Sequence, residues 1–168
     1  NADRTKIRFT LQPTYQRHFL PAFIPPGEIA TIDIPESLVG SLSICLNHQT
    51  YDFSGGDTPK FKQRINQLKV QEIKLEKKSN TIGLPYGATV VFYYSGNDPV
   101  EVNVSNVILQ PYFYYGMTSD EEWETDYSKR PGPYAYFDTG NLVFEVPSKF
   151  VRESTRVNDA LFYWRSAI

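Results

Sequence analysis

The most informative part of the sequence is Gln110-Pro-Tyr-Phe-Tyr-Tyr-Gly-Met-Thr-Ser-Asp-Glu-Glu-Trp123, which is followed by Arg130-Pro-Gly-Pro-Tyr-Ala-Tyr-Phe137. The aromatic run has the composition of a β-strand and stops at Gly116. An acidic segment with a helix-start pattern comes next, and a Pro-Gly-Pro corner closes the stretch. Few folds need this order, so the stretch points to one kind of domain.

The acidic segment predicts a short capped helix. Ser119 and Glu122 have the spacing of a capping box, in which the hydroxyl and the carboxylate each accept a backbone N–H at the helix start. Negative side chains at this end also complement the helix dipole. We expect a helix from about Asp120 to Tyr127, with Trp123 holding it against a sheet. The residues of this expected structural motif are Gly116, Ser119, Glu122, Trp123, Pro131 and Pro133.

Most of the remaining sequence shows strand patterns separated by turn residues. Val100-Glu-Val-Asn-Val104 alternates most clearly, and Thr89–Tyr94 is a continuous β-branched and aromatic run typical of a strand buried on both faces. The sequence therefore predicts a mainly β fold, an antiparallel, jelly-roll-like β-sandwich with one short capped helix and a C-terminal helix. Further strand-like segments cover residues 7–11, 28–34, 42–46, 73–75, 106–109 and 142–146.

The C-terminal helix is expected to begin with Asn158 or Asp159 as its N-cap. It carries Leu161, Phe162 and Trp164 and is apolar nearly all round. A helix with this composition needs cover. We expect that it either folds back on the sandwich or leads into another domain.

The bulk properties describe one globular domain. A chain of 168 residues can bury a real core, and no repeat or linker divides it, so residues 1–168 are expected to form a single β-sandwich domain. The net charge of −2 gives no long-range attraction to nucleic acid or to an anionic membrane, so neither is an expected partner. No apolar run approaches the roughly 18 residues of a membrane span.

Residues that carry catalysis are sparse. The two histidines, His18 and His48, lack the His-x-x-x-His spacing that a zinc peptidase needs. The single cysteine, Cys45, sits in an apolar run that favours a buried, inert thiol. The acids of Asp120–Asp126 fit a solvated helix face better than a calcium loop. We expect no enzymatic activity, no cofactor and no bound metal.

Tyrosines near loops are the remaining candidates for a binding site. Exposed tyrosines can stack on sugar rings while offering a hydroxyl, or they can anchor a protein interface. Alternatively they pack the sandwich or the small helix, and strand alternation directs about half of each run inward. The candidate ligand-binding residues are Tyr112, Tyr114, Tyr115, Tyr134 and Tyr136.

The triplet Asn103-Val-Ser105 is an N-glycosylation sequon. It falls on a predicted strand whose valines would face inward while Asn103 faces outward. Asn103 is therefore a candidate glycosylation site, and it is one small indication of an extracellular, secreted chain.

Six short motifs occur in a fixed order along the chain. They are Phe23-Ile-Pro-Pro-Gly-Glu28, Pro85-Tyr-Gly87, Pro111 with Gly116, Thr118-Ser-Asp-Glu-Glu-Trp123, Arg130-Pro-Gly-Pro-Tyr-Ala-Tyr-Phe137 and Phe144-Glu-Val-Pro-Ser148, ahead of Trp164. This order resembles the β-sandwich region that precedes the catalytic domain of the enhancin-like, mucin-cleaving zinc metallopeptidases, peptidase family M-sixty. The resemblance covers about residues 20–166.

Two positions depart from the family pattern. The tryptophan of the family's Pro-Trp-Ala segment is Tyr134 here, and the family's glycine pair is Tyr86-Gly87. The family's zinc ligands and catalytic glutamate lie downstream of the region that this chain resembles. The resemblance therefore carries no catalytic residue over to this chain.

Taken together, the resemblance and the tyrosines suggest a non-catalytic, extracellular binding module. The expected ligand is a glycan or glycoprotein of the mucin-like type. The alternative is a structural or protein-interaction domain. Its partner would be a separate protein or a downstream zinc-peptidase domain on which the module packs.

Overall fold

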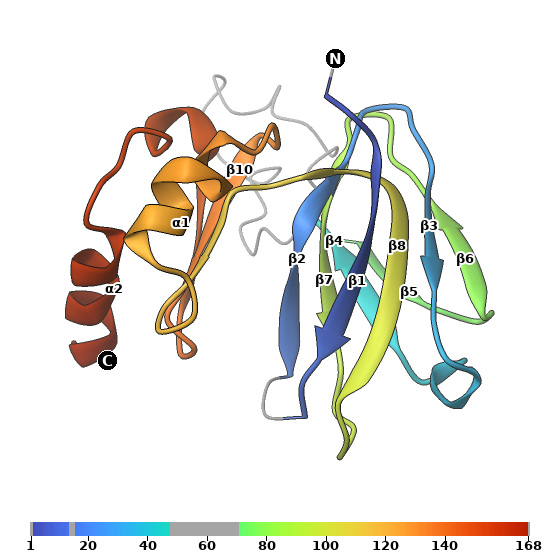
Figure 1. Ribbon diagram of the computed structural model, residues 1–168. Coiled ribbons are helices and arrows are strands. Elements are labelled where there is room, and N and C mark those ends of the chain that lie inside the picture. The colour runs from blue at the N-terminus through green and yellow to red at the C-terminus, as the bar shows by residue number, and fades with distance from the viewer. Residues whose placement is uncertain (1, 14–15, 48–70, 168) are drawn as a thin grey trace, which may run out of the picture. The chain divides into compact units, whose positions relative to one another are not determined.

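The structure is a computed structural model that describes residues 2–13, 16–47 and 71–167 (Figure 1). The chain divides into two compact units. The sheet unit contains Arg4–Leu20 and Ile24–Val107, and the C-terminal unit contains Pro21–Phe23 and Ile108–Ile168 together with the first three residues. The single domain expected over residues 1–168 stays a prediction. The segment after Val107 contains a hydrophobic core cluster.

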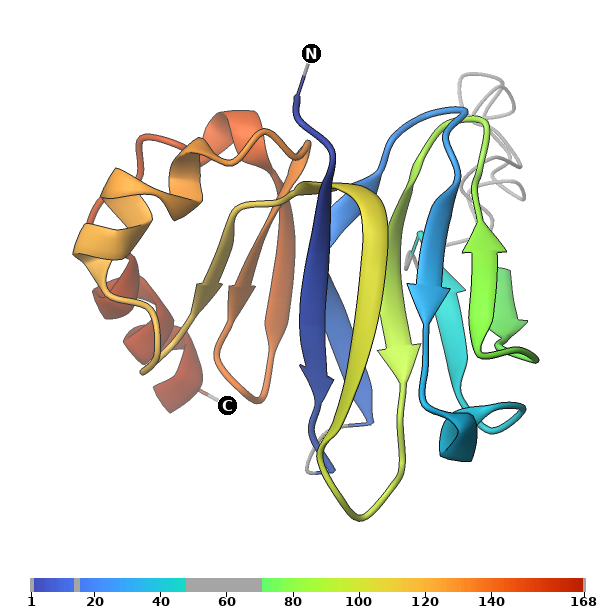
Figure 2. The ribbon, with the colours of Figure 1, turned by 45° about the vertical axis from the view of Figure 1, so that its right-hand side comes forward.

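The sheet unit is an antiparallel sheet that curls around its core (Figure 2). In hydrogen-bonded order the strands run β5-β4-β7-β2-β8-β3-β6, and β1 also pairs with β8. Phe9 on β1 lies 6.1 Å from Phe92 on β7 between ring centroids, so both halves of the curled sheet share one core. The strands are β1 (Thr5–Leu11), β2 (Arg17–Ile24), β3 (Ala30–Asp33), β4 (Ser43–Leu46), β5 (Gln71–Lys74), β6 (Ser79–Ile82), β7 (Ala88–Tyr93) and β8 (Val100–Leu109).

Strand alternation explains this core. On β8, Val102 and Val104 are fully buried, while Glu101 is exposed. The segment Val90–Phe92 of β7 is buried throughout, as expected for a strand covered on both faces. Strand β8 contains Asn106, whose φ of 61° is rare for a residue with a side chain. The mainly β, antiparallel fold class predicted from the sequence is confirmed.

The C-terminal unit is a three-stranded sheet with two helices. Strand β10 (Tyr134–Asp138) pairs in parallel with β9 (Tyr112–Tyr114) and antiparallel with β11 (Val143–Pro147). Helices α1 (Asp120–Thr125) and α2 (Val157–Ser166) pack on one face of this sheet (Figure 1). The fully or nearly buried residues of this core are Phe113, Trp123, Ala135, Phe137, Val157 and Leu161.

Helix α1 forms the predicted capping box. The Ser119 hydroxyl accepts the Glu122 amide at 3.1 Å, and the Glu122 carboxylate accepts the Ser119 amide at 2.8 Å. The bond from the Ser119 amide, together with one from the Ser119 hydroxyl to the same carboxylate (3.0 Å), lowers the pKa of the Glu122 carboxyl, because both favour its ionised form. Strand β9 ends at Tyr114, and the turn that follows contains Gly116, whose φ of 78° suits glycine. The helix ends at Thr125, sooner than the predicted Tyr127, and a 3₁₀ turn follows at 127–129.

The Pro-Gly-Pro corner is held by glycine and by an arginine. A Cβ atom at Gly132 would lie 2.5 Å from the Gln110 Cγ atom and 2.8 Å from its Cα atom, so only glycine fits there. The Arg152 guanidinium donates to the carbonyl oxygens of Ser128, Arg130 and Gly132, at 2.7, 2.7 and 3.2 Å. It also donates to the hydroxyl of Ser148, which lies in the 3₁₀ turn just before Arg152 (3.1 Å).

The predicted N-cap of the C-terminal helix is wrong. The residue at the N-cap of α2 is Arg156, in the left-handed conformation with a φ of 55°. Asn158 and Asp159 lie inside the helix, because each has another role. The backbone amide of Asn158 donates to the Asp120 carboxylate of α1 (3.0 Å). The Asp159 carboxylate accepts from the Arg156 guanidinium (2.8 Å).

Candidate functional site

The residues of classical hydrolytic chemistry are buried or dispersed. His18 is 7 % exposed and lies between Phe9 and Tyr94, with 6.4 Å between ring centroids on each side. His48 lies outside the described residues. Burial raises the pKa of the Cys45 thiol, which disfavours the nucleophilic thiolate. Within residues 2–13, 16–47 and 71–167, no group of three His, Cys, Asp or Glu side chains could hold a metal ion.

The register of the three-stranded sheet sorts the candidate tyrosines onto two faces. Tyr136 is the partner of Tyr112 on β9 and of Glu145 on β11, so these three side chains share a face. Tyr114 and Tyr134 lie an even number of positions away and belong to the same face. We call this surface the tyrosine face. Its members are Tyr112, Tyr114, Tyr134, Tyr136, Asp138, Val143, Glu145 and Pro147.

Tyr115 lies on the opposite side, with the helices. It is partly buried against the core around Trp123. The Arg165 guanidinium of α2 stands over its ring, 5.3 Å from the centroid. The structure therefore separates Tyr115 from the other four candidates and gives it a packing role under α2.

Hydrogen bonds between phenols and carboxylates organise the tyrosine face. The Tyr136 hydroxyl donates to Glu145 Oε2 at 2.8 Å, and the Tyr112 hydroxyl donates to Asp138 Oδ2 at 2.6 Å. The Tyr112 and Tyr136 rings lie 5.8 Å apart at an angle of 60°. These contacts fix two rings and two carboxylates in one rigid array.

Burial shifts the titration of this array. It raises the pKa of the Tyr112 phenol well above its ordinary value, and the Asp138 carboxylate adds to that rise. Burial also raises the pKa of the Tyr134 phenol, with a further contribution from the Glu145 charge. Burial raises the pKa of the Glu145 carboxyl, and the hydrogen bond from Tyr136 offsets part of this rise. The phenols therefore remain protonated hydrogen-bond donors at neutral pH.

The four tyrosines of this face differ in accessibility. Tyr136 is fully buried and contributes a positioned hydroxyl rather than a ring surface. Tyr112, Tyr114 and Tyr134 are half-buried. The Tyr134 ring packs against Phe23 of β2 at 6.2 Å, and its backbone amide donates to Gln110 (3.2 Å). Aromatic surface for a ligand on this face therefore comes from Tyr112, Tyr114 and Tyr134.

Asp138 and Glu145 are the residues that reasoning from the sequence missed. Both sit at positions that alternation assigns to the tyrosine side of their strands. Glu145 lies in Phe144-Glu-Val146, where a carboxylate between two core residues is the usable signal. Its pairing with Tyr136 depends on strand register, which no local pattern specifies.

The predicted glycosylation residue, Asn103, is half-buried in the middle of the sheet unit. It pairs with Arg8 of β1 on one side and with Asp33 of β3 on the other. Its glycosylation stays a prediction.

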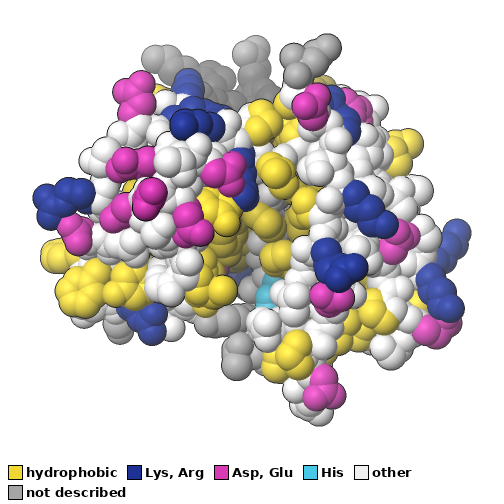
Figure 3. All heavy atoms as spheres, viewed as in Figure 1, with side chains coloured by type: hydrophobic (Ala, Val, Ile, Leu, Met, Phe, Trp, Pro, Cys, Tyr) yellow, Lys and Arg dark blue, Asp and Glu magenta, His cyan; other side chains and the backbone are white. Residues whose placement is uncertain are grey.

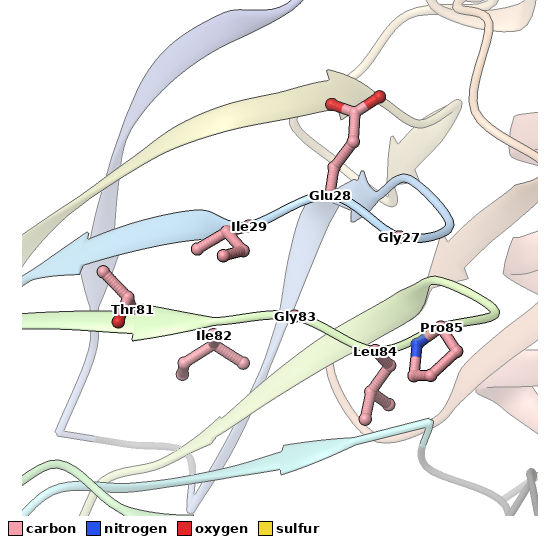
Figure 4. A pocket seen from close by; sticks show the side chains of 8 residues that line it. All are labelled: Gly27, Glu28, Ile29, Thr81, Ile82, Gly83, Leu84 and Pro85. Carbon is pink, nitrogen blue, oxygen red and sulfur yellow. The ribbon is translucent and has the colours of Figure 1, made fainter.

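Two of the sequence motifs meet at a hollow of about 420 Å³ in the sheet unit (Figure 4). A Cβ atom at Gly83 would lie 2.4 Å from the Glu28 carbonyl oxygen, so glycine is needed where the two segments touch. The Glu28 side chain points away from the hollow and pairs with Arg4 (2.7 Å). The hollow therefore offers mainly apolar contact. It is lined by Gly27, Glu28, Ile29, Thr81, Ile82, Gly83, Leu84 and Pro85.

Helix α2 exposes a row of aromatic residues. Only Val157 and Leu161 of this helix are buried. Phe162, Tyr163 and Trp164 are 60 %, 69 % and 47 % exposed. Hydrophobic side chains accordingly gather over α2 in Figure 3, while acidic side chains gather over α1. The nearly all-round apolar helix predicted from the sequence is thus covered on one side.

Two family profiles match the chain, and together they span nearly all of it. Residues 1–105 match the N-terminal domain of M60-like peptidases. Residues 106–167 match peptidase M60, enhancin and enhancin-like. The chain belongs to the M60-like peptidase family. The boundary between the two matches lies within a few residues of the boundary between the two compact units.

The curated relatives of this M60-like chain are much longer proteins. The chain is 25 % identical over 146 residues to a TRPM8 channel-associated factor homolog of Danio rerio and to TRPM8 channel-associated factor 1 of Homo sapiens. These matches cover 84 % of the chain but only 16 % and 15 % of the relatives.

Solved structures with the same fold include two metallopeptidases. The IMPa metallopeptidase from Pseudomonas aeruginosa superposes with a TM-score of 0.73 at 22 % identity, over 99 % of this chain and 20 % of IMPa. The catalytic module of the metalloprotease ZmpA from Clostridium perfringens superposes with a TM-score of 0.59 at 14 % identity, over 95 % of this chain and 36 % of that chain. No helix among the described residues of the M60-like chain is long and apolar enough to cross a membrane.

Proposed function

We propose that this M60-like chain is a non-catalytic, extracellular module that binds glycan or glycoprotein surfaces of the mucin-like type. The tyrosine face is the proposed binding surface. The observation that carries the proposal is the array of half-buried tyrosine rings beside two hydrogen-bonded carboxylates. Sugars bind to proteins through aromatic surface for their C–H faces and polar groups for their hydroxyls.

The comparisons support the ligand class. Structures of IMPa that share this fold are described as complexes with T-antigen and with an O-glycopeptide, with TM-scores of 0.64 and 0.63. A family whose members meet O-glycosylated substrates gives a binding module a reason to recognise them. The non-catalytic part of the proposal is motivated by the described residues, among which no group of three His, Cys, Asp or Glu side chains could hold a metal ion.

Replacing Tyr134 by alanine is expected to weaken glycan binding at least tenfold, or about 1.4 kcal/mol. The change removes aromatic surface from the tyrosine face but keeps the Tyr134 amide that donates to Gln110. Binding is measured on a glycan array and then by titration calorimetry with the best ligand. Tyr134→Phe, which keeps the ring, should retain most of the affinity.

Tyr115→Ala is the matched control. It removes the same side chain from the opposite face of the same sheet, so glycan affinity should stay within about twofold of wild type, corresponding to ~0.4 kcal/mol. Circular dichroism confirms that each variant is folded. A blank array for the wild-type chain, or equal losses in Tyr115→Ala and Tyr134→Ala, would overturn the proposal.

A second candidate function is protein interaction, and the exposed aromatic row of α2 favours it. Phe162, Tyr163 and Trp164 are large apolar surfaces of the kind that anchor protein interfaces. The partner would be a separate protein or the zinc-peptidase domain that longer members of the family contain.

If α2 carries such an interface, the chain is expected to form concentration-dependent oligomers or a stable complex with a peptidase domain of this family. The double change Phe162→Asp and Tyr163→Asp should weaken that association at least tenfold, or about 1.4 kcal/mol. Tyr86→Asp, at an equally exposed tyrosine of the sheet unit, is the control and should leave it unchanged. Sedimentation velocity measures the association of the wild-type chain and of both variants. A wild-type chain that is a monomer at every concentration and forms no complex would exclude protein interaction through α2.

A further inference from the structure

The charges on the tyrosine face are of one sign. Asp138 and Glu145 are its ionisable carboxylates, and none of its described members is a lysine or an arginine. Lysine and arginine are the usual protein partners of a ligand carboxylate. An anionic sugar would therefore meet like charge at this surface without a matching cation.

The hydrogen-bonding capacity of the face has the same bias. The Tyr112 and Tyr136 hydroxyl protons are used on Asp138 and Glu145, so neither phenol has a proton left for a ligand. Asp138 also accepts the Gly140 amide through its other oxygen (2.7 Å). The lone pairs that remain on the half-buried Asp138 and Glu145 carboxylates accept hydrogen bonds. A ligand that meets these carboxylates must supply donors, as sugar hydroxyls and N-acetyl amides do.

We infer that the tyrosine face selects uncharged glycans and discriminates against glycans that end in sialic acid. This inference deepens the proposed glycan-binding function and rests on it. Sugar hydroxyls complement the acceptors of Asp138 and Glu145, whereas the carboxylate of a sialic acid brings a third negative charge to the face. The ligand class is therefore a neutral, galactose- or N-acetylhexosamine-terminated mucin-type glycan.

The test compares two probes that differ by one sugar, with the full chain at pH 8. One probe is an O-glycopeptide that ends in galactose, and the other is the same glycopeptide with sialic acid on that galactose. The neutral probe is expected to bind at least tenfold more tightly at about 20 mM salt. The ratio of the affinity for the neutral probe to that for the sialylated probe should shrink in about 1 M salt, where charges are screened within roughly 3 Å.

Glu145→Gln identifies the source of the discrimination. The amide oxygen can still accept the Tyr136 hydroxyl, while one negative charge is removed. The ratio of affinities for the neutral and the sialylated probe is expected to fall at least threefold. Glu121→Gln on the exposed surface of α1 makes the same change in net charge away from the tyrosine face, and it should leave the ratio unchanged.

The outcomes separate this inference from the function on which it rests. Equal or tighter binding of the sialylated probe overturns the charge selection and leaves glycan binding standing. Failure of both probes to bind overturns both. An equal fall of the ratio in Glu145→Gln and Glu121→Gln would show that net charge, and not the tyrosine face, discriminates, which also overturns the inference.

Discussion

Replacing Trp123 by alanine is expected to lower the free energy of unfolding by about 3–5 kcal/mol. The side chain is fully buried between Phe113 and Phe137, with ring centroids 5.9 and 5.1 Å away. Its indole N–H donates to the Ser154 carbonyl at 3.0 Å, so the change also leaves that oxygen without its donor. Urea denaturation followed by circular dichroism measures the loss.

Trp164→Ala is the matched control, since the chain has two tryptophans. Trp164 is 47 % exposed, and its ring centroid lies 5.3 Å from that of Phe144. Its removal should therefore lower the free energy of unfolding by no more than about 1 kcal/mol. A similar loss in both variants would mean that Trp123 is not the centre of the C-terminal core.

Arg152→Met is expected to cost about 3 kcal/mol of stability, because it leaves three carbonyl oxygens without their charged donor. Methionine keeps the apolar stem of the side chain and removes only the guanidinium. Arg152→Lys should fall between methionine and wild type, because a single ammonium cannot reproduce the planar fork. The same denaturation experiment measures all three proteins.

Arg156→Met provides the comparison on the surface of the same unit. The Arg156 side chain is 82 % exposed and pairs with Asp159, and an exposed pair of this kind contributes about 0–1 kcal/mol. If Arg152→Met were as mild as Arg156→Met, the Pro-Gly-Pro corner would hold without the guanidinium, contrary to this account.

Features of the sequence that act locally could be predicted. The capping box of Ser119 and Glu122 depends on residues three apart, and it is formed. The alternation of Val100–Val104 depends on period two, and both inner valines are buried. The boundaries of α2 could not be read in the same way, because Asn158 is drawn into the helix by Asp120, which lies 38 residues earlier.

Strands β2 and β6 escaped prediction for different reasons. Strand β2 contains Pro21 within a continuous apolar run, so it shows neither alternation nor the composition of a central strand. Strand β6 is the short polar run Ser79–Ile82 at the end of the sheet order, where little burial shapes the sequence. Both are paired through long-range contacts that no window of sequence contains.

The candidate site shows the same limit. Sequence alone groups five tyrosines as equivalent, whereas the register of β9 to β11 brings four of them to one face, and Tyr115 packs against the core around Trp123. Burial then distinguishes Tyr136, which is fully covered, from Tyr134, which keeps accessible surface. The partnership of Tyr136 with Glu145 is a consequence of strand pairing and has no local signature.

The most direct test of the central claim is an NMR titration of the full, isotope-labelled chain with the galactose-terminated O-glycopeptide. The account predicts saturable shifts of backbone amides in β9, β10 and β11, with the same titration much weakened in Tyr134→Ala. Shifts confined to α2 or to the hollow around Gly83, or no shifts at ligand concentrations that saturate known glycan-binding proteins, would contradict it.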